Sequence, residues 1–432
     1  MSAVISADWV LPVEGPPIER GAVVIEDGRV AAVGTADELG SGEHYPGAAI
    51  VPGFVNAHSH LEYAVYAGFG DGLEFASWLA LHVERKRRLD YDDMLASARL
   101  GAAECLASGI TTVGDASYSG AAAAACAELG LRAIVYLEVF KSDPSAALQR
   151  FGELRARIEP ELSDRVRLGV SPHTPYTTSA EVYAACFELG LPVMTHLAES
   201  EAETLWLTTG EGPMAGLISQ EPVGTTGIRH LAGHGLLGPQ LLAAHCVAVD
   251  AEEIALLAEH DVAVAHCPRS NALLGCGIAP LTDLRAAGLR VGIGTDSPAS
   301  APSFDMFDEL RAAVSSARAR ERRPDALSAT EALELATLGS ARALGLDDEV
   351  GSLVQGKRAD LAVVALDASP YVPWEDAAAA VVFGGSPQSV LTTLVDGEAR
   401  YERGGFRWQE LRSNGASARS RALAGLPVAA SR

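Results

Sequence analysis

The order of apolar and polar positions predicts a repeated alternation of helix and strand through the middle of the chain. Segments with helical periodicity end at a glycine and are followed by short apolar runs of strand length. Residues 125–131 and 185–191 show this unit most clearly, since each closes a helix with Glu-Leu-Gly-Leu. Strands that alternate with helices pair in parallel through crossover connections, so the pattern predicts an α/β fold.

Eight such strands can be counted, and several of them are apolar on both faces. Strands of that kind are covered by helices outside and packed within. Eight parallel strands close into a (β/α)₈ barrel, which takes about 250 residues, as does this part of the chain. The predicted strands are residues 50–60, 110–116, 132–140, 166–172, 192–196, 241–247, 262–266 and 290–295.

The two ends of the chain have a different texture, with short strands joined by tight turns. Asp27-Gly28 separates two apolar runs near the N-terminus, and Asp396-Gly397 repeats the hairpin signal near the C-terminus. We therefore expect both termini to form one small β-sandwich domain around the barrel. The expected ranges are 1–51 and 346–412 for the small domain, 52–345 for the barrel, and 413–432 for a poorly ordered tail rich in Ser, Ala and Arg.

Composition narrows the class of partner. A net charge of −23 and a pI near 4.8 argue against nucleic acid and anionic membranes, which need a basic face, and favour a small-molecule ligand. The six cysteines contain no Cys-X-X-Cys and are expected in helices and strands as reduced thiols, which predicts a cytoplasmic protein. No apolar run approaches the roughly 20 residues of a membrane helix. Homo-oligomerisation is left open.

Histidines and carboxylates stand at or just after the carboxyl ends of the predicted strands. His58 and His60 are two residues apart, and side chains two apart on a strand point the same way. One such histidine is more often a packed core residue than a ligand, but the placement recurs on separate strands. The recurring residues are Asp115, His173, His196, Glu199, His245, His266 and Asp296. Enzymes with this fold place their chemistry at that edge, so the repetition predicts a metal-dependent active site.

The chain resembles the amidohydrolase superfamily over nearly its whole length, including the divided β domain. The motif His58-Ser-His60, then His196, His245 and Asp296 within Gly-Thr-Asp-Ser-Pro, stand in the order of that superfamily's metal site. The resemblance implies that His58, His60, His196 and Asp296 bind one divalent metal. Binuclear members carry a bridging carbamylated lysine on the fourth strand, which here ends in His173. Zinc is the leading expectation, although imidazole and carboxylate also suit iron and manganese.

His196-Leu-Ala-Glu199 resembles the deaminase and chlorohydrolase branch of the superfamily. There the glutamate moves a proton between the attacking water and a ring nitrogen of the substrate. The resemblance implies three catalytic residues: Glu199 as proton shuttle, Asp296 as acceptor of the water's proton, and His245 as the group that orients the hydroxide and stabilises the tetrahedral intermediate. A solvated glutamate at a helix start, beside Glu201 and Glu203, is the structural alternative.

Three stretches resemble the aminofutalosine deaminases in particular: residues 75–79 with the basic run 85–88, residues 108–115, and residues 266–271. The implied substrate is 6-amino-6-deoxyfutalosine, a nucleoside of the menaquinone pathway that carries a carboxylate. Its binding would use Trp78, His173 and a cation, for which Arg87, Arg88 and Arg269 are candidates. Trp78 as a core aromatic and residues 85–88 as a solvated helix face are equally open.

Other functions on the same scaffold remain open at this stage. Adenosylhomocysteine or methylthioadenosine deaminase is the runner-up, and guanine deaminase is a further alternative. A chlorohydrolase of the same fold would share the metal site, although Glu199 favours deamination. A non-catalytic binding protein is disfavoured because no expected ligand is missing.

Overall fold

The computed structural model describes residues 2–367 and 372–424. Its centre is a sheet of eight parallel strands in chain order, and the backbone N–H of Asp296 donates to the carbonyl of His58 at 3.0 Å, which joins the last strand to the first. The predicted (β/α)₈ barrel is thereby confirmed. The strands are β5 (Phe54–Ser59), β6 (Ile110–Ser117), β7 (Arg132–Val139), β8 (Val166–Pro172), β9 (Val193–Leu197), β10 (Leu241–His245), β11 (Ala263–His266) and β12 (Val291–Ile293).

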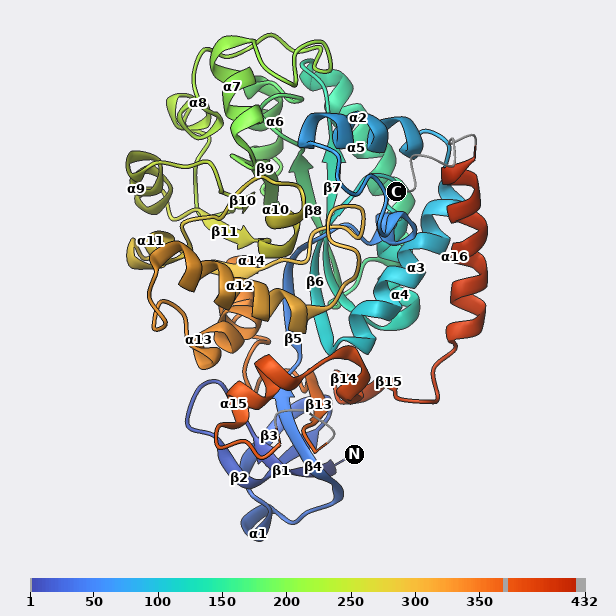
Figure 1. Ribbon diagram of the computed structural model, residues 1–432. Coiled ribbons are helices and arrows are strands. Elements are labelled where there is room, and N and C mark those ends of the chain that lie inside the picture. The colour runs from blue at the N-terminus through green and yellow to red at the C-terminus, as the bar shows by residue number, and fades with distance from the viewer. Residues whose placement is uncertain (1, 368–371, 425–432) are drawn as a thin grey trace.

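Helices follow the strands and surround them (Figure 1). Local contacts fix where the helices begin and end. Asp143, for example, accepts hydrogen bonds from the backbone N–H groups of Ser145 and Ala146 at the start of helix α5, and Gly130 ends helix α4 with a φ of 76°. The helices are α2 (Phe75–Lys86), α3 (Tyr91–Ala107), α4 (Ala121–Leu129), α5 (Pro144–Ile158), α6 (Ala180–Phe187), α7 (Glu201–Thr209), α8 (Gly227–Gly233), α9 (Ala251–Glu259), α10 (Pro268–Leu273), α11 (Leu281–Ala286), α12 (Met306–Glu321), α13 (Ala329–Glu334) and α14 (Ser340–Leu344).

The first predicted strand, residues 50–60, is two strands in the structure. β4 (Glu43–Pro52) belongs to the small domain and β5 begins at Phe54, with Gly53 between them donating its N–H to the carbonyl of Asp360 at 2.9 Å. A Cβ at Gly53 would lie 2.2 Å from the side chain of Thr111, so only glycine fits there. An unbroken apolar run hid this boundary, because the second half of β4 and all of β5 are buried.

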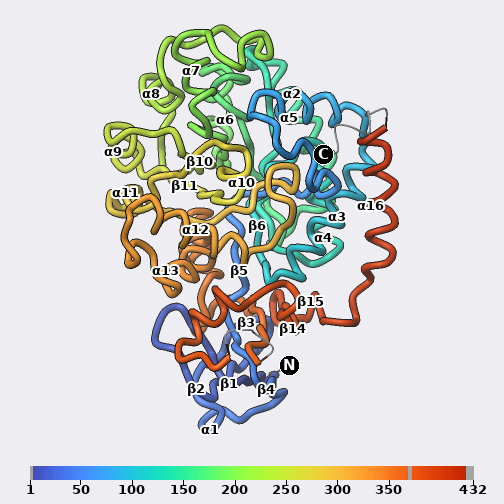
Figure 2. Tube along the Cα trace, in the orientation of Figure 1, coloured from blue at the N-terminus to red at the C-terminus, as the bar shows by residue number. Residues whose placement is uncertain are grey.

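The small domain is one seven-stranded mixed sheet made from both ends of the chain, as expected. Figure 2 shows the N-terminal segment and the segment after the barrel side by side. Both predicted hairpins are present, with Asp27-Gly28 and Asp396-Gly397 at their turns. In spatial order the strands are β15 (Glu398–Glu402), β14 (Val390–Val395), β13 (Leu361–Ala365), β4, β1 (Ser2–Val10), β2 (Ile18–Glu26) and β3 (Arg29–Thr35), with short helices α1 (Ala36–Leu39) and α15 (Ala377–Ala379).

The expectation of a poorly ordered tail over 413–432 is corrected for its first part. Helix α16 (Trp408–Leu423) lies along α3 at the side of the barrel (Figure 1). Its small residues Gly415, Ala418 and Ala422 are buried, so a composition typical of disorder instead permits close packing between helices. Residues 425–432 lie outside the described part of the chain.

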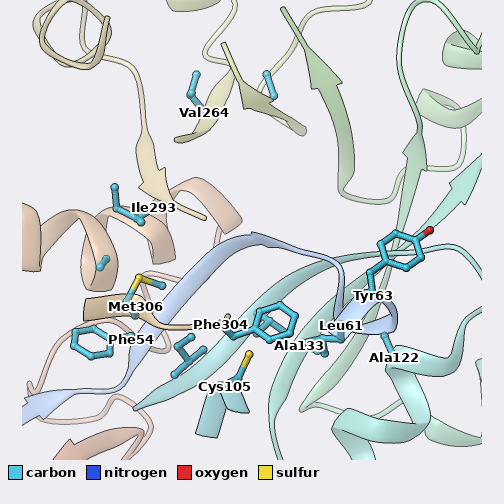
Figure 3. Close-up of a cluster of buried hydrophobic side chains, with 14 of the residues drawn as sticks. Phe54, Leu61, Tyr63, Cys105, Ala122, Ala133, Val264, Ile293, Phe304 and Met306 are labelled. Carbon is cyan, nitrogen blue, oxygen red and sulfur yellow. The ribbon is translucent and has the colours of Figure 1, made fainter. Parts of the chain in front are cut away.

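The core brings distant segments together. Phe54 and Leu61 from the first barrel strand and its turn pack in one cluster with Cys105 of α3 and with Phe304 and Met306 (Figure 3). All six cysteines are buried and unpaired, but Cys246, Cys267 and Cys276 lie just outside helices and strands, contrary to expectation. Within residues 2–367 and 372–424, no helix is both long and apolar enough to cross a bilayer.

Candidate active site

Four predicted side chains meet at the mouth of the barrel. His58 is the last residue but one of β5, His60 directly follows that strand, His196 lies on β9, and Asp296 follows β12. The Nε2 atoms of His60 and His196 are 3.1 Å apart, and Asp296 Oδ1 lies 3.6 Å from His58 Nε2 and 3.7 Å from His60 Nε2. Parallel strands bring their carboxyl ends to one edge, which is why residues from 58 to 296 share one point.

The donor set fits a single divalent metal. His58 Nε2 is buried with no hydrogen-bond partner among the described residues, although the aspartate lies near it. His196 Nδ1 lies 3.0 Å from the carbonyl of His173, and a carbonyl only accepts, so Nδ1 carries the proton and Nε2 presents a lone pair to the cluster. A cation would satisfy together the lone pair of His196 Nε2, the facing Nε2 of His60 and the orphaned Nε2 of His58, as expected of three histidines and one carboxylate.

Asp296 is held in its ionised form. Its second oxygen, Oδ2, accepts hydrogen bonds from Ser270 at 2.6 Å and Ser300 at 2.8 Å, which leaves Oδ1 facing His58 and His60. Burial raises the pKa of this carboxyl, but His58, His245 and His60 outweigh burial and hold it well below its usual range. Asp296 can therefore serve as a ligand and accept a proton from an attacking water.

Glu199 is buried at the same site and is not a solvated helix-start residue. Its carboxylate lies 3.7 Å from His245 Nε2. One side-chain atom each of Glu199, His245 and Asp296 lies within 4.8 Å of the other two. Glu203 accepts from the backbone N–H groups of Ala198 at 3.0 Å and Glu199 at 2.8 Å, so it fixes the turn that aims Glu199 inward. Burial raises the pKa of Glu199 to about 7, a value suited to taking and returning a proton near neutral pH.

His245 lies beside Glu199 and Asp296 and is held in place by a hydrogen bond. Its Nδ1 lies 3.0 Å from Asn271 Oδ1, which directs Nε2 toward Glu199. Burial disfavours the charged imidazole, but Glu199, Asp296 and Asn271 together outweigh burial and raise the pKa of His245. Such a ring can donate a hydrogen bond to developing negative charge.

The backbone at the site is strained where the strands end. Four non-glycine residues there have positive φ angles: Ala198 (52°), His245 (79°), Cys246 (47°) and Asp296 (55°). Each such conformation costs about 1–3 kcal/mol and persists only where the surroundings enforce it. Strain gathered beside His245, Glu199 and Asp296 is typical of a site built for function.

The cluster opens into a cavity of about 770 Å³, a size typical of small-molecule pockets. Trp78 lines it, stacks on His82 and donates from Nε1 to the carbonyl of Ala299 at 3.0 Å, so it is a pocket wall as well as a packed aromatic. His173 also lines it, with its Nδ1 2.9 Å from Thr177 Oγ1.

The three candidate arginines are placed differently. Arg87 lines the pocket, and its guanidinium has no hydrogen-bond or ion-pair partner among the described residues. Arg88 points away and pairs with Glu84 at 2.9 Å. Arg269 does not line the pocket, and it donates to Ser303 and to the carbonyl of Asp305, both at 3.1 Å. Of the three, only Arg87 lines the pocket and stays a candidate for contact with a substrate.

Sequence reasoning missed several residues of the pocket. Lys86, Lys141 and Arg150 line it together with Arg87, and Glu138 lies at the end of β7. The position of Glu138 and Lys141 at a strand end was a usable signal, since the same signal identified the histidines. Lys86 and Arg150 come from helices, and no spacing in the chain predicts that they reach the pocket.

A barrel whose strand ends bring three buried histidines and an aspartate to one point defines the class of metal-dependent hydrolases, which activate water at the barrel mouth. Sequence comparison names the family within that class. The model described as "Amidohydrolase family" matches residues 49–400. The chain belongs to the amidohydrolase family and is an enzyme of that family.

Relatives resemble the chain along nearly its whole length. A 5-methylthioadenosine/S-adenosylhomocysteine deaminase of Symbiobacterium thermophilum is 34% identical, with 92% of this chain and 93% of the relative covered. A 5′-deoxyadenosine deaminase of Methanothermobacter thermautotrophicus is 33% identical, with 92% of each covered. The crystal structure of an adenosine deaminase from Xanthomonas campestris with bound zinc superimposes with a TM-score of 0.86 at 29% identity, covering 97% of this chain and 98% of that one.

Proposed function

We propose that the protein is a metal-dependent hydrolytic deaminase that releases ammonia from the 6-amino group of an adenine-type nucleoside. The observation that carries the proposal is Glu199, a buried carboxyl with its pKa raised to about 7 that faces His245 beside the four-residue metal cluster. A hydrolase that only needed to activate water would not require a second proton carrier at that place. The relatives named above are adenine-nucleoside deaminases, which supports the same reaction.

The residues divide the reaction among them. A bound divalent metal, held by His58, His60, His196 and Asp296, supplies Lewis acidity and lowers the pKa of water toward about 7. Asp296 takes one proton of the attacking water while protonated Glu199 gives its proton to the ring nitrogen next to the amino-bearing carbon. Glu199 then takes the remaining proton of the added hydroxyl and gives it to the departing ammonia, and the proton on Asp296 returns to Glu199 for the next cycle. His245 donates to the oxygen that adds to the ring.

Zinc is the proposed metal, with iron and manganese as alternatives that the same ligands accommodate. Bound zinc in the Xanthomonas adenosine deaminase supports this choice. Metal analysis of the purified protein, followed by removal with a chelator and reconstitution with each metal, distinguishes the three.

The leading substrate is 6-amino-6-deoxyfutalosine, because it carries a carboxylate at the end remote from the base. Four basic side chains line the pocket of a protein whose net charge is −23: Lys86, Arg87, Lys141 and Arg150. The charged side-chain groups of Arg87 and Lys141 have no hydrogen-bond or ion-pair partner among the described residues, so their charges are available to an anionic group of the substrate. Methylthioadenosine has no such group, and adenosylhomocysteine carries an α-amino group beside its carboxylate.

Ammonia release tests the proposal. The zinc-loaded protein is offered 6-amino-6-deoxyfutalosine, adenosine, methylthioadenosine, adenosylhomocysteine, guanine and a chlorotriazine. The proposal expects the highest kcat/KM for 6-amino-6-deoxyfutalosine. Faster turnover of the thioether nucleosides moves the assignment to the runner-up, whereas turnover of guanine or of the chlorotriazine alone rejects it.

Substitution of Arg87 tests the carboxylate contact. A charged hydrogen bond contributes about 1.5–3 kcal/mol, so Arg87→Met should lower kcat/KM for the carboxylated nucleoside about 10- to 150-fold and leave adenosine nearly unchanged. The matched control is Arg88→Met, since the neighbouring arginine pairs with Glu84 outside the pocket. Equal losses on both substrates, or an equal effect of both variants, contradict the contact.

A further inference from the structure

A charged pair in the pocket has no part in the chemistry described so far. Glu138 lies at the end of β7 with 2% of its surface exposed, and its Oε2 has no hydrogen-bond partner among the described residues. Lys86, at the end of α2, holds its Nζ 4.0 Å from the centre of the Tyr118 ring. Both side chains line the cavity.

The two charges influence each other without satisfying each other. Burial raises the pKa of Glu138 to about 7, and Lys86 opposes that rise. Burial likewise lowers the pKa of Lys86, against the attraction of Glu138. No direct ion pair joins them, so hydrogen-bonding capacity remains on the carboxylate inside the cavity.

Glu62 is a second buried carboxylate near Lys86 and Glu138, and its hydrogen bonds are those of a structural residue. It accepts hydrogen bonds from the backbone N–H groups of Tyr118, Ser119 and Ala121 and from the hydroxyl of Ser117, and it does not line the cavity. Glu138 has no such set of donors. A buried carboxylate left without donors is costly to stability, so its presence in a ligand cavity indicates that a ligand supplies them.

The position of the pair shows which part of a ligand it meets. Glu138 Oε1 lies 3.9 Å from His173 Nε2, and the ring of His173 lies 4.9 Å from that of His196. Glu138 thus lies beside His173 at the edge of the metal cluster, with a carboxylate oxygen within 4.8 Å of ring nitrogens of both His173 and His196, and it lines the same cavity as the cations Lys141 and Arg150. In a nucleoside whose base lies beside Glu199 and His173, the sugar is the next part along the molecule.

We propose that Glu138 and Lys86 form the subsite that recognises the sugar hydroxyl groups of the nucleoside. A hydroxyl is both donor and acceptor, so it can donate to the carboxylate of Glu138 while its oxygen accepts from the ammonium of Lys86. Two neighbouring hydroxyls can use both carboxylate oxygens. The proposal rests on the nucleoside function proposed above, and it adds a specificity toward ribose that Glu199 and the metal ligands cannot supply.

The unmodified, zinc-loaded enzyme gives the first test, with adenosine, 2′-deoxyadenosine and 3′-deoxyadenosine as probes. Loss of the recognised hydroxyl should lower kcat/KM about 10- to 150-fold, as expected for a hydrogen bond to a charged group. Equal kcat/KM for all three nucleosides overturns the subsite. This arm needs no variant, so it stands even where a substitution impairs folding.

The second test is Glu138→Gln, with Lys86→Met beside it. Each variant should lower kcat/KM for adenosine and leave the deoxynucleoside that lacks the recognised hydroxyl nearly unchanged, so that discrimination disappears while metal content stays constant. A matched control is Glu104→Gln, which removes a carboxyl of similarly raised pKa in α3, outside the pocket. Equal slowing of every nucleoside by Glu138→Gln means that Glu138 acts through His173, and it overturns the proposal.

A binding measurement distinguishes a failure of the proposed sugar subsite from a failure of the proposed deaminase function. Calorimetry with the Glu199→Gln protein compares adenosine with the two deoxynucleosides in the absence of turnover. Tighter binding of adenosine than of a deoxynucleoside supports the subsite. Equal binding overturns the subsite alone, whereas absence of both binding and turnover for every nucleoside overturns the deaminase assignment with it.

Discussion

Glu199 lies three residues beyond His196, where a continued strand would turn it away from the cluster. The positive φ of Ala198 reverses the chain, and Glu203 holds the new direction through two backbone N–H groups. The site therefore separates metal binding, which uses strand-end histidines, from proton transfer, which uses a residue on the loop.

Variants of the two groups should fail in different ways. Glu199→Gln keeps shape and metal but cannot carry a proton, so kcat should fall by about 10² to 10⁴, the usual contribution of a positioned acid–base group. The paired variant His60→Ala removes a ligand and should lose both metal and activity. Elemental analysis and steady-state kinetics on both proteins check this. Near-normal turnover by Glu199→Gln, or stoichiometric metal in His58→Ala/His60→Ala protein, refutes the respective role.

A carboxyl away from the site makes stability depend on pH. Burial raises the pKa of Glu104 in α3 from 4.5 to about 7, against the attraction of Arg412. Between these values the unfolded chain releases the proton and the folded chain keeps it, so this residue's contribution to stability is present below pH 4.5 and is lost as the pH rises through 7.

Glu104→Gln removes that dependence. Since one pKa unit corresponds to about 1.4 kcal/mol, the free energy of unfolding of the variant relative to the parent should rise by up to about 3 kcal/mol between pH 4.5 and 7 and then level off. Urea unfolding of both proteins at several pH values measures the difference. A difference that stays constant over this range contradicts the prediction.

At the scale of elements, Gly53 decides where one strand stops and the next begins. The apolar run through it continues without interruption, yet β4 pairs with β13 in the small sheet while β5 enters the barrel. The turn is possible because the backbone of Gly53 approaches Thr111 more closely than any side chain allows.

Gly53→Ala should therefore destabilise the fold by about 1–3 kcal/mol, the usual range for overpacking. The control is Gly152→Ala in α5, where nothing lies within 4 Å of an added Cβ, and where alanine should stabilise the helix by about 0.5–1 kcal/mol. Thermal unfolding of both variants gives the comparison. A neutral Gly53→Ala means that Thr111 moves aside.

For the whole molecule, a buried ion pair joins barrel and small domain. Arg132 on β7 donates from Nε to Asp360 at 2.8 Å and from a second nitrogen at 3.2 Å, and it also reaches Asp396 at 2.6 Å. The side chains of Arg132 and Asp360 are only 3% and 1% exposed. The two domains are therefore expected to unfold as one unit.

Arg132→Met leaves Asp360 buried without its partner, which should cost about 3–5 kcal/mol. Urea unfolding followed by fluorescence and by circular dichroism measures the loss and tests for a single transition. The exposed pair of Arg323 and Asp325 is the control, since Arg323→Ala should leave the midpoint unchanged. Separate transitions for two domains in the parent protein contradict the coupling.

The sequence by itself determined the parallel barrel, the small domain from both termini and the strand-end positions of the site residues. Hydrophobic periodicity and strand-end placement are local properties, and β8 follows its prediction residue for residue. Helix starts and hairpin turns are local for the same reason.

Only the tertiary structure decided which charges reach the pocket. Arg87 and Arg88 are neighbours in the turn that follows α2, yet one lines the cavity and the other pairs with Glu84 outside it, because successive residues of the turn point in different directions. Arg269 is held by Ser303 and Asp305, which are distant from it in sequence. The proposed role of Glu138 likewise depends on Lys86 and His173, which are distant from Glu138 in sequence. Burial and unmet hydrogen bonds depend on every neighbour in space, and no spacing along the chain encodes them.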